Sequence, residues 1–321
     1  MESTALGSTG VRVTRLGLGC ASLGNLFRAM GDDRARATVE AAWESGIRYF
    51  DTAPHYGLGL SERRLGAALR DRPRDRFTIS SKVGRLLVPN DAPSGTDLAE
   101  GFDVPDTLMR RFDFTADGVR RSLEESLRRL ALDRLDVVYV HDPDEFVDVA
   151  IEQAVPALAR LRDEGVIGAV GVGMNAVAPL RRFVAEADVD AIMVAGRWTL
   201  LDRSAEELLD EAADRNVAVV AAAPFNSGLL ARADPPEDAT YDYRPVPAEL
   251  LETTRELAAA ARASGVTLPQ AALQFPLRHP AVAAVVVGAA SPEEIRANAA
   301  HLAEPVPDDA WARLATTVAT R

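Results

Sequence analysis

Four side chains that can take part in proton transfer stand at, or just beyond, the ends of short runs typical of β-strands. They are Asp51, Tyr56, Lys82 and His141, and the runs cover residues 48–51, 78–83 and 135–141. Taken singly, each side chain has an ordinary structural use in a cap, a packing contact, a surface charge or a core hydrogen bond. At the ends of neighbouring strands, however, they would bring an acid, a phenol, a cation and an imidazole to one place.

These four residue types form a set that can move a proton to or from a substrate oxygen. A phenol is a poor acid at neutral pH, because its unperturbed pKa is about 10. We expect the ammonium of Lys82 to lower the pKa of Tyr56 below that of free tyrosine, and the carboxylate of Asp51 to hold Lys82 charged and in place. The imidazole of His141 can orient the substrate oxygen. The set suits an oxidoreductase that couples proton transfer at the oxygen to hydride transfer at its carbon.

The elements that must position these residues alternate along the whole chain. We expect strands at 16–19, 48–51, 78–83, 135–141, 168–173, 191–195, 217–222 and 283–287. We expect amphipathic helices at 33–45, 115–130, 147–164, 204–215 and 247–264, and from Ser291 onward. Several strands are nearly continuous apolar runs, which is typical of strands buried on both faces. The alternation predicts one (β/α)8 TIM barrel over residues 1–321, with a doubly wound sheet as the alternative.

Two connections are longer than ordinary ones, and both follow strands on the C-terminal face, where barrels keep their active sites. Residues 84–114 follow the third strand and residues 225–246 follow the seventh. Long loops inside a compact domain are usually functional, so we expect these two to select the substrate. The first fourteen residues predict a hairpin ahead of the barrel, because Gly7 and Gly10 separate short β-like pieces.

The composition argues against several kinds of partner and site. The chain has 321 residues, is 47% hydrophobic and carries a net charge of −12, which disfavours nucleic acid or an anionic membrane as its partner. The single cysteine, Cys20, and the four scattered histidines suggest neither a disulfide nor a metal site. No basic-then-apolar leader opens the sequence, and no apolar run approaches the ~20 residues of a membrane span. We expect a cytoplasmic enzyme with a small-molecule substrate, and the sequence leaves its oligomeric state open.

The motifs around these residues resemble the aldo-keto reductase superfamily over essentially the whole chain. The matching segments are LGSTG at 6–10, LGLG at 16–19, FDTAPHYG at 50–57, SKV at 81–83, LDVVYVH at 135–141 and VVG at 286–288. The resemblance implies that Asp51, Tyr56, Lys82 and His141 are a catalytic tetrad. It also implies that a nicotinamide cofactor lies across the barrel mouth, with no metal and no Rossmann fold. Residues 171–176 do match a G-x-G-x-x-A fingerprint, but they lie in mid-chain and no acidic residue ends the next strand.

The resemblance also implies which residues hold the cofactor. Many relatives have Ser-Asn after the fifth strand and Gln at the end of the sixth, where this chain has Met174-Asn175 and Ala195. Asn175 is implied to bond the carboxamide, Trp198 to stack on the nicotinamide ring and Asn298 to contact adenine. The phosphates are expected at a helix N-terminus and at a strand end, that is, at Gly288, Ala289, Ala290 and Ser291, and at Phe225, Asn226, Ser227, Gly228 and Leu229.

Position 290 bears on the choice between NAD and NADP. In relatives that prefer NADP, a lysine or arginine usually stands two residues after the glycine that ends the eighth strand, where this chain has Ala290. Glu294 would repel a 2′-phosphate and accept a hydrogen bond from a free ribose hydroxyl. Arg296, one turn of helix along, is the residue best able to pair with that phosphate instead. We expect NAD, with NADP as the alternative.

Three further segments, 171–175, 195–202 and 224–230, resemble one branch of the superfamily. This branch contains the D-threo-aldose 1-dehydrogenases, also called L-fucose dehydrogenases, and pyridoxal 4-dehydrogenase is similar to it. The first hypothesis is therefore an NAD(P)-dependent oxidoreductase that oxidises the C1 hydroxyl of an aldose to a lactone. A reductase of small aldehydes or ketones, including a pyridoxal-type substrate, is the second. A non-enzymatic, cofactor-binding regulatory subunit is the third, and the complete tetrad argues against it.

Overall fold

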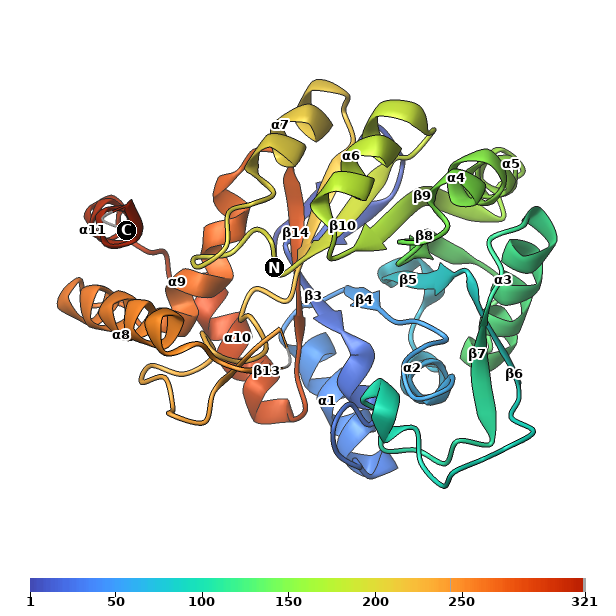
Figure 1. Cartoon of the computed structure of the whole chain (residues 1–321), viewed down its shortest axis with the longest axis horizontal. Coiled ribbons are helices and arrows are strands. Elements are labelled where there is room, and N and C mark those ends of the chain that lie inside the picture. The colour runs from blue at the N-terminus through green and yellow to red at the C-terminus, as the bar shows by residue number, and fades with distance from the viewer. Residues whose placement is uncertain (243, 320–321) are drawn as a thin grey trace.

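Eight parallel strands close into a barrel in the computed structural model, which describes residues 1–242 and 244–319 (Figure 1). Tyr243, in the second long loop, and residues 320–321 lie outside the described part. In order around the barrel the strands are β3 (Leu16–Gly19), β4 (Tyr49–Asp51), β5 (Thr78–Val83), β8 (Leu135–His141), β9 (Ile167–Met174), β10 (Ala191–Ala195), β11 (Ala218–Ala222) and β14 (Val282–Gly288), which pairs with β3. The predicted TIM barrel is confirmed, and each predicted strand end lies within one residue of the observed one.

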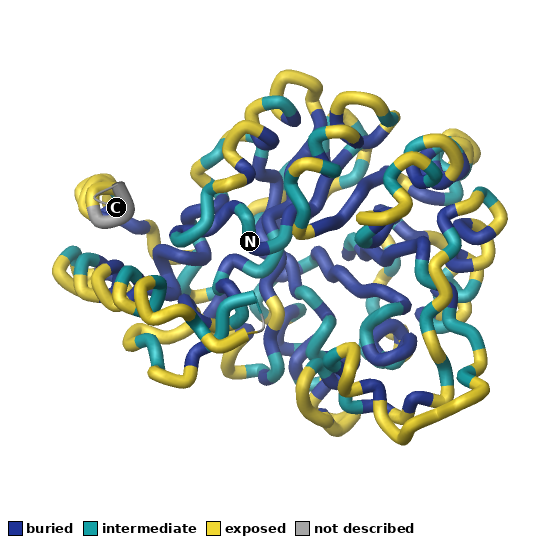
Figure 2. The backbone as a smooth tube through the Cα atoms, in the orientation of Figure 1, coloured by how far each residue is buried: buried dark blue, intermediate teal, exposed yellow. Residues whose placement is uncertain are grey.

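Side chains of the strands alternate between two apolar layers. Tyr49, Val137, Tyr139 and Met193 are among those that fill the barrel interior. The residues between them belong to the layer under the helices, with Phe50, Val138, Val140, Ile192 and Val194 as examples. Figure 2 shows the strands as a buried centre inside helices with exposed outer faces. Because both faces of each strand are covered, several strands, such as β10, β11 and β14, are continuous apolar runs rather than alternating ones.

Helices form the outer layer of the barrel. They are α1 (Asp32–Glu44), α2 (Leu60–Leu69), α3 (Ala116–Leu130), α4 (Val147–Val149), α5 (Val155–Asp163), α6 (Val177–Glu186), α7 (Glu206–Asp214), α8 (Ala248–Ala263), α9 (Leu268–Gln274), α10 (Pro292–Ala303) and α11 (Asp308–Ala319). The expected helix at 147–164 is one segment in which a π turn, Ala150–Ala154, joins α4 to α5. Short 3-10 turns cover Cys20–Gly24 (η1), Arg74–Arg76 (η2), Leu98–Glu100 (η3) and Phe275–Arg278 (η5). Thr115 and Ser291 cap α3 and α10 by accepting hydrogen bonds from Gly118 and Glu294. No helix in residues 1–242 and 244–319 is long and apolar enough to cross a bilayer.

Three two-stranded hairpins lie outside the barrel in the described part of the chain. The predicted N-terminal hairpin pairs β1 (Ser3–Ala5) with β2 (Arg12–Thr14). The long connection 84–114 is largely an antiparallel hairpin of β6 (Arg85–Pro89) and β7 (Leu108–Phe112), which lies beside α3 (Figure 1). The connection 225–246 carries only the short pair β12 (Thr240–Tyr241) and β13 (Arg244–Pro245). The first long loop therefore has regular secondary structure, which the sequence did not indicate.

Candidate active site

Three neighbouring strands bring Asp51, Lys82 and His141 to the C-terminal end of the barrel. β4 pairs with β5 and β5 pairs with β8, all in parallel, so their carboxyl ends meet at one face. Asp51 and Lys82 are 2% exposed and His141 is 7% exposed. Tyr56 stands on the loop after β4 and is half-buried. The ring centres of Tyr56 and His141 are 6.0 Å apart, with the rings perpendicular.

A close approach of two backbone segments fixes the loop that carries Tyr56. Gly57 has a φ of +61°, and a Cβ at this position would lie 2.2 Å from the carbonyl oxygen of Gly24. A Cβ on Gly24 would in turn lie 2.6 Å from the carbonyl of Tyr56. Only glycine fits at either position, so the loop is locked against η1 and the phenol has a defined place.

Lys82 is the centre of the hydrogen-bond network. Its Nζ donates to Oδ2 of Asp51 at 2.7 Å, to the carbonyl oxygen of Thr52 at 3.0 Å and to the hydroxyl oxygen of Tyr56 at 3.2 Å. All three ammonium protons therefore have acceptors, and the buried charge is compensated by a carboxylate. Lys82 thus joins three of the four residues that the sequence grouped, and the ring of His141 lies beside that of Tyr56.

The electrostatic state of this group differs from the expectation in one respect. Burial raises the pKa of Tyr56 to about 12, with Lys82 opposing the rise and Asp51 adding to it. The expectation that Lys82 would bring this pKa below that of free tyrosine is therefore wrong, because burial takes more hydration from the phenolate than one ammonium restores. Burial disfavours the ammonium of Lys82, yet the charges of Asp51 and Tyr56 outweigh it and raise the pKa of Lys82. Burial and the cations Arg85 and Lys82 lower the pKa of His141. At neutral pH the site thus holds a phenol, an ammonium and a neutral imidazole.

Asp51 accepts a hydrogen bond from a chain of buried hydroxyl groups in the barrel interior, which the sequence did not indicate. The Oγ of Ser80 donates to Oδ1 of Asp51 at 2.7 Å and lies 3.2 Å from the hydroxyl of Tyr49, which lies 3.2 Å from that of Tyr139. Ser80 has one proton and gives it to the carboxylate, so Tyr49 must donate to Ser80 and Tyr139 to Tyr49. All three side chains are fully buried, and every proton of the chain is directed toward Asp51.

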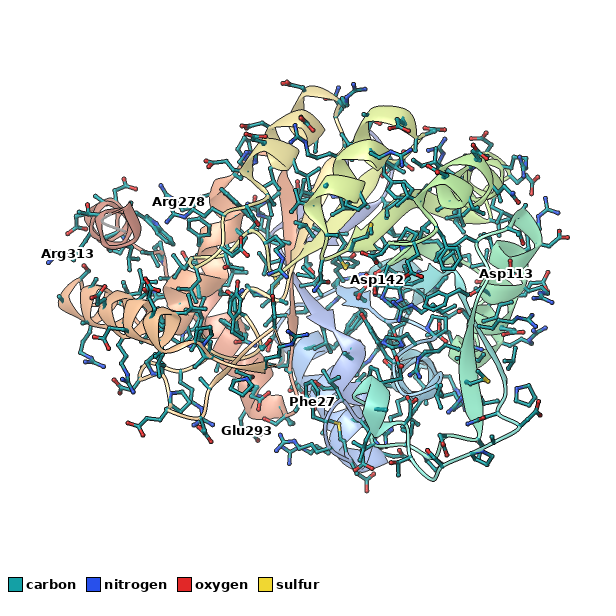
Figure 3. All side chains as sticks on the ribbon, viewed as in Figure 1. Phe27, Asp113, Asp142, Arg278, Glu293 and Arg313 are labelled. Atoms are coloured by element: carbon teal, nitrogen blue, oxygen red, sulfur yellow. The ribbon has the colours of Figure 1, made fainter. Side chains whose placement is uncertain are left out.

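Two further charged residues stand at the mouth beside His141. Nη2 of Arg85 lies 2.6 Å from Oδ2 of Asp142, and that oxygen lies 3.5 Å from Nε2 of His141. Arg85 begins the hairpin and Asp142 directly follows β8, and Figure 3 shows Asp142 over the middle of the barrel. The sequence offered one signal for Asp142, its position directly after His141, and none for Arg85.

The strand-end segment expected to meet the cofactor phosphates is an irregular turn. The amides of Gly228 and Leu229 donate to the carbonyls of Phe225 and Asn226 at 3.0 and 3.2 Å, so in this structure they are paired within the turn. Asn226 has a φ of 45°, and its Oδ1 is buried with no hydrogen-bond partner within the described chain. Ser227 is half-buried and Gly228 is exposed, with open space where a Cβ would stand. An unpaired buried acceptor and an open backbone are features of a surface shaped for a polar ligand.

The other expected phosphate segment leads into α10. Gly288 ends β14 and is exposed, Ala289 is buried and Ala290 is half-buried. The carboxylate of Glu294 accepts a hydrogen bond from the amide of Ala290 at 2.7 Å, and Ser291 caps the amide of Glu294 at 3.2 Å.

Three residues near α10 bear on the adenosine end of a dinucleotide. Arg34 donates to the carbonyl oxygen of Ala290 at 2.8 Å. Arg296 lies 3.5 Å from Glu44 of α1, so its side chain is directed to that helix in this structure. Asn298 is buried on α10.

Trp198 differs from its expected place. Its Nε1 donates to the carbonyl oxygen of Pro276 at 3.2 Å, and its ring packs against Phe275 and His279 in the layer under the helices. The chain turns outward after β10, and a 6% exposed indole in this layer has no free face for a ring at the mouth. Stacking of Trp198 on the nicotinamide is therefore not supported. Asn175, in contrast, is exposed directly after β9.

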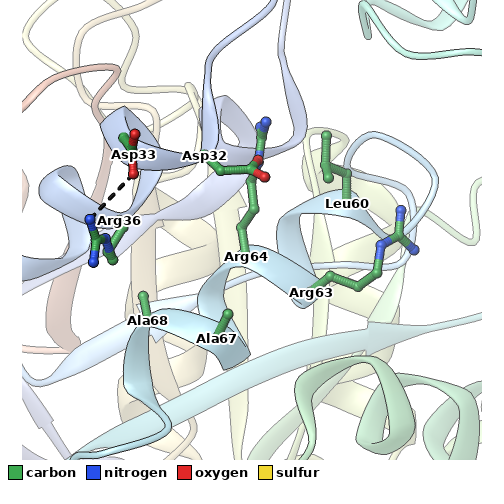
Figure 4. Close-up of a pocket in the computed structure, with 8 residues that line it drawn as sticks. All are labelled: Asp32, Asp33, Arg36, Leu60, Arg63, Arg64, Ala67 and Ala68. Carbon is green, nitrogen blue, oxygen red and sulfur yellow. Dashed lines mark hydrogen bonds and ion pairs between the residues drawn. The ribbon is translucent and has the colours of Figure 1, made fainter.

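A surface groove of about 360 Å³ lies between α1 and α2, outside the barrel (Figure 4). Its polar lining is largely paired within the groove, because Arg64 bonds Asp32 at 2.8 Å and Arg36 bonds Asp33 at 3.3 Å. The groove contains none of the tetrad residues, and we give it no part in the chemistry. Among the described residues no cluster of three or more His, Cys, Asp or Glu suits a metal ion.

Known proteins match this chain in sequence and in fold. A model of the aldo/keto reductase family matches residues 15–318. A D-threo-aldose 1-dehydrogenase from a Pseudomonas species is 50% identical over 98% of both chains. A pyridoxal 4-dehydrogenase from Microbacterium luteolum is 40% identical over 98% of this chain and 96% of its own. The holo form of an aldo-keto reductase from Bacillus halodurans superposes with a TM-score of 0.79 at 26% identity, covering 99% of this chain and 96% of the other.

Proposed function

The chain belongs to the aldo/keto reductase family of oxidoreductases, which use NAD(P)(H), and on that premise we propose that it oxidises the C1 hydroxyl of an aldose to a lactone. The observation that carries the chemistry is the position of Lys82, with its Nζ 2.7 Å from Asp51 and 3.2 Å from the hydroxyl of Tyr56. The observation that supports the substrate class is the 50% identity to a D-threo-aldose 1-dehydrogenase over nearly the whole of both chains.

Tyr56 is the acid-base residue in this proposal. In oxidation its phenolate takes the proton of the C1 hydroxyl. At the same time the C1–H bond breaks and the bond between C1 and the hydroxyl oxygen becomes double. The nicotinamide ring, when bound, supplies the acceptor for the hydride. Lys82 stabilises the phenolate by charge, and Asp51 with its hydroxyl chain keeps Lys82 ionised and in position. His141 is neutral, so it orients the substrate oxygen by a hydrogen bond without competing for the proton.

The residues around the mouth suit a nicotinamide dinucleotide. Asn175 offers an exposed amide for the carboxamide, and the buried, unpaired Oδ1 of Asn226 offers an acceptor beside the open backbone of Gly228. The dipole at the N-terminus of α10, which begins after Ser291, favours an anion there. Asn298 is assigned to the adenine end, by family resemblance. The remaining predicted residues, Phe225, Ser227, Leu229 and 288–290, line these same two segments.

We further propose that NAD is preferred over NADP. Ala290 supplies no cation, and the carboxylate of Glu294 already bonds the amide of Ala290 at 2.7 Å. A 2′-phosphate placed there would meet this negative charge, whereas a ribose hydroxyl would donate to it. Arg296 is paired with Glu44.

A second candidate activity is the oxidoreduction of a pyridoxal-type aldehyde or alcohol, favoured by the 40% identity to a pyridoxal 4-dehydrogenase. Both candidates use the same proton transfer by Tyr56, so only the substrate separates them. The test is a panel of aldoses, pyridoxal, pyridoxine and small aldehydes, assayed with both nicotinamides by the absorbance of the reduced ring. Highest kcat/KM for an aldose with C1 oxidation supports the first proposal, and highest kcat/KM for pyridoxal replaces it with the second.

A further inference from the structure

His55, which precedes Tyr56, is held by residues 85–112, the hairpin of β6 and β7 with its connection, which we call the hairpin insertion. Nε of Arg110, on β7, donates to Nδ1 of His55, and Nη2 of Arg110 donates to the main-chain oxygen of His55 at 2.8 Å. Arg110 is itself fixed by two 2.6 Å hydrogen bonds to the carboxylate of Asp97. Arg110 and Asp97 are each 7% exposed, so this is a buried, bidentate clamp rather than a surface ion pair.

The apolar side chains of the hairpin insertion also pack against His55 and Tyr56. Phe102 meets the ring of His55 edge-on, with centres 5.1 Å apart. Phe102 also belongs to a small core with Leu58 and Val104, against which Tyr56 packs. The insertion therefore has a core of its own, and that core is built around the loop of His55 and Tyr56.

The clamp determines which nitrogen of His55 carries its proton. Nδ1 accepts a hydrogen bond from a guanidinium, which cannot act as an acceptor, so the proton of the neutral ring is on Nε2. No hydrogen bond between described residues engages Nε2, and His55 is only partly buried. Burial lowers the pKa of His55 to about 2, with Arg85, Arg110 and Lys82 acting in the same direction. The ring is therefore neutral at neutral pH, with Nε2–H as a donor that no described residue accepts from.

This donor lies beside the two groups assigned to the reacting oxygen. The ring of His55 is centred 5.7 Å from that of His141 and 6.0 Å from that of Tyr56. A substrate whose C1 oxygen lies between Tyr56 and His141 brings its neighbouring atoms to His55. In a cyclic aldose those neighbours are the ring oxygen and the C2 hydroxyl. The ring oxygen gives electron density to C1 as the hydride leaves, so a donor there would oppose the reaction, whereas a donor to the C2 hydroxyl would not.

We propose that His55 is a specificity-determining residue whose Nε2–H donates to the C2 hydroxyl of the substrate, with Arg110 as the residue that positions it. The inference rests on the proposed function and narrows the substrate class to aldoses that carry a hydroxyl at C2. The hairpin insertion then contributes to substrate binding, because Arg110 holds His55 in the tautomer whose Nε2–H can donate to the substrate.

The test compares an aldose with its 2-deoxy analogue in the full-length enzyme. We use L-fucose and 2-deoxy-L-fucose, or the best aldose of the panel and its analogue, and take the ratio of their kcat/KM values. One well-placed neutral hydrogen bond, lost with its partner left unpaired, predicts a ratio of roughly ten or more for the wild type. His55→Leu removes the donor and should lower the ratio by at least about fivefold. His55→Gln keeps an acceptor for Arg110 and a donor for the substrate, and should keep the ratio within about threefold of the wild type.

Phe102→Leu is the matched control, because it disturbs the packing of His55 without removing the donor. It should lower both kcat/KM values together and leave their ratio unchanged. A wild-type ratio near one, or a His55→Leu ratio within about twofold of the wild type, would overturn the inference while aldose turnover still supports the proposed function. Absence of turnover with every aldose would overturn the proposed function itself, and the inference with it.

Discussion

The ammonium of Lys82 lies 3.2 Å from the hydroxyl oxygen of Tyr56, yet burial still raises the pKa of that phenol to about 12. The two statements are compatible, because the same enclosure that lets Lys82 act at short range also removes the water that would solvate a phenolate. The resting site is therefore poised to give a proton, and must first lose one before it can accept a proton in oxidation.

The pH dependence of the two directions follows from this state. A raised pKa keeps Tyr56 protonated, so the reactive phenolate fraction grows with each pH unit up to the pKa. We expect kcat/KM for oxidation to rise through pH 10 without a plateau, and kcat/KM for reduction to stay level over the same range. The measurement is a paired pH profile at constant ionic strength, and a plateau of the oxidation profile below pH 8 would contradict the assigned state of Tyr56.

The hydroxyl chain beneath Asp51 should act as one unit. Ser80→Ala leaves Oδ1 of Asp51 and the hydroxyl of Tyr49 without their partner, at a cost of roughly 1–3 kcal/mol in the free energy of unfolding. Tyr49→Phe leaves the buried hydroxyl of Tyr139 without its acceptor, and it should cost less in the Ser80→Ala background than in the wild type, because the hydrogen bond from Tyr49 to Ser80 is already gone. Urea denaturation of the two single variants and the double variant measures this coupling. Strictly additive losses would show that the chain does not support Asp51.

The hairpin insertion should determine substrate choice but not folding. Replacing residues 85–112 by a short Gly-Ser linker removes Arg85 and Arg110 while leaving β5 and α3 intact. We expect kcat/KM for the best aldose to fall by at least about tenfold, since Arg85 leaves the mouth and Arg110 no longer positions His55. Nicotinamide binding, followed by quenching of protein fluorescence, should change little. An unchanged order of preference across the substrate panel would show that specificity lies elsewhere.

The start of α10 should set the choice of dinucleotide. The wild type is expected to prefer NAD by about tenfold or more in kcat/KM, equivalent to about 1.4 kcal/mol. Ala290→Arg adds a cation at the expected place of a 2′-phosphate and should shift the ratio toward NADP. Ala297→Arg is the matched control, because it adds the same charge to an exposed position farther along α10. A wild-type preference for NADP, or equal shifts in both variants, would refute the role of position 290.

The sequence predicts the barrel well because its signals are local. Thr78–Val83 and Leu135–His141 are buried on both faces and flanked by polar turns, and their predicted ends agree with the observed ones. The meeting of Asp51, Lys82 and His141 then follows from parallel topology alone. The hairpin is different, since Leu108–Phe112 mixes charged and apolar residues without alternation and its partner strand lies beyond residues 90–107.

What the sequence could not predict depends on burial and on the path of the chain. Trp198 follows β10 closely, but nothing in the local sequence tells whether the chain turns toward the mouth or outward. Ser80 is a small polar residue in a strand, and only the register with Asp51 makes it a hydrogen-bond donor to that carboxylate. The pKa of Tyr56 was misjudged for the same reason, because the sequence shows the charge of Lys82 but not the loss of water around the phenol.

The central claim is that Tyr56 moves the proton, and Tyr56→Phe tests it most directly. The variant removes one oxygen and leaves the ring in its core with Phe102, so the fold and the cofactor Kd should stay near the wild type. Tyr139→Phe, which removes a hydroxyl at the far end of the chain to Asp51, serves as the control and should keep most of the activity. For Tyr56→Phe we predict that the single-turnover rate constant of aldose oxidation falls by roughly 10²–10⁴-fold. Retention of more than about a tenth of the wild-type rate, with cofactor binding intact, would contradict the account.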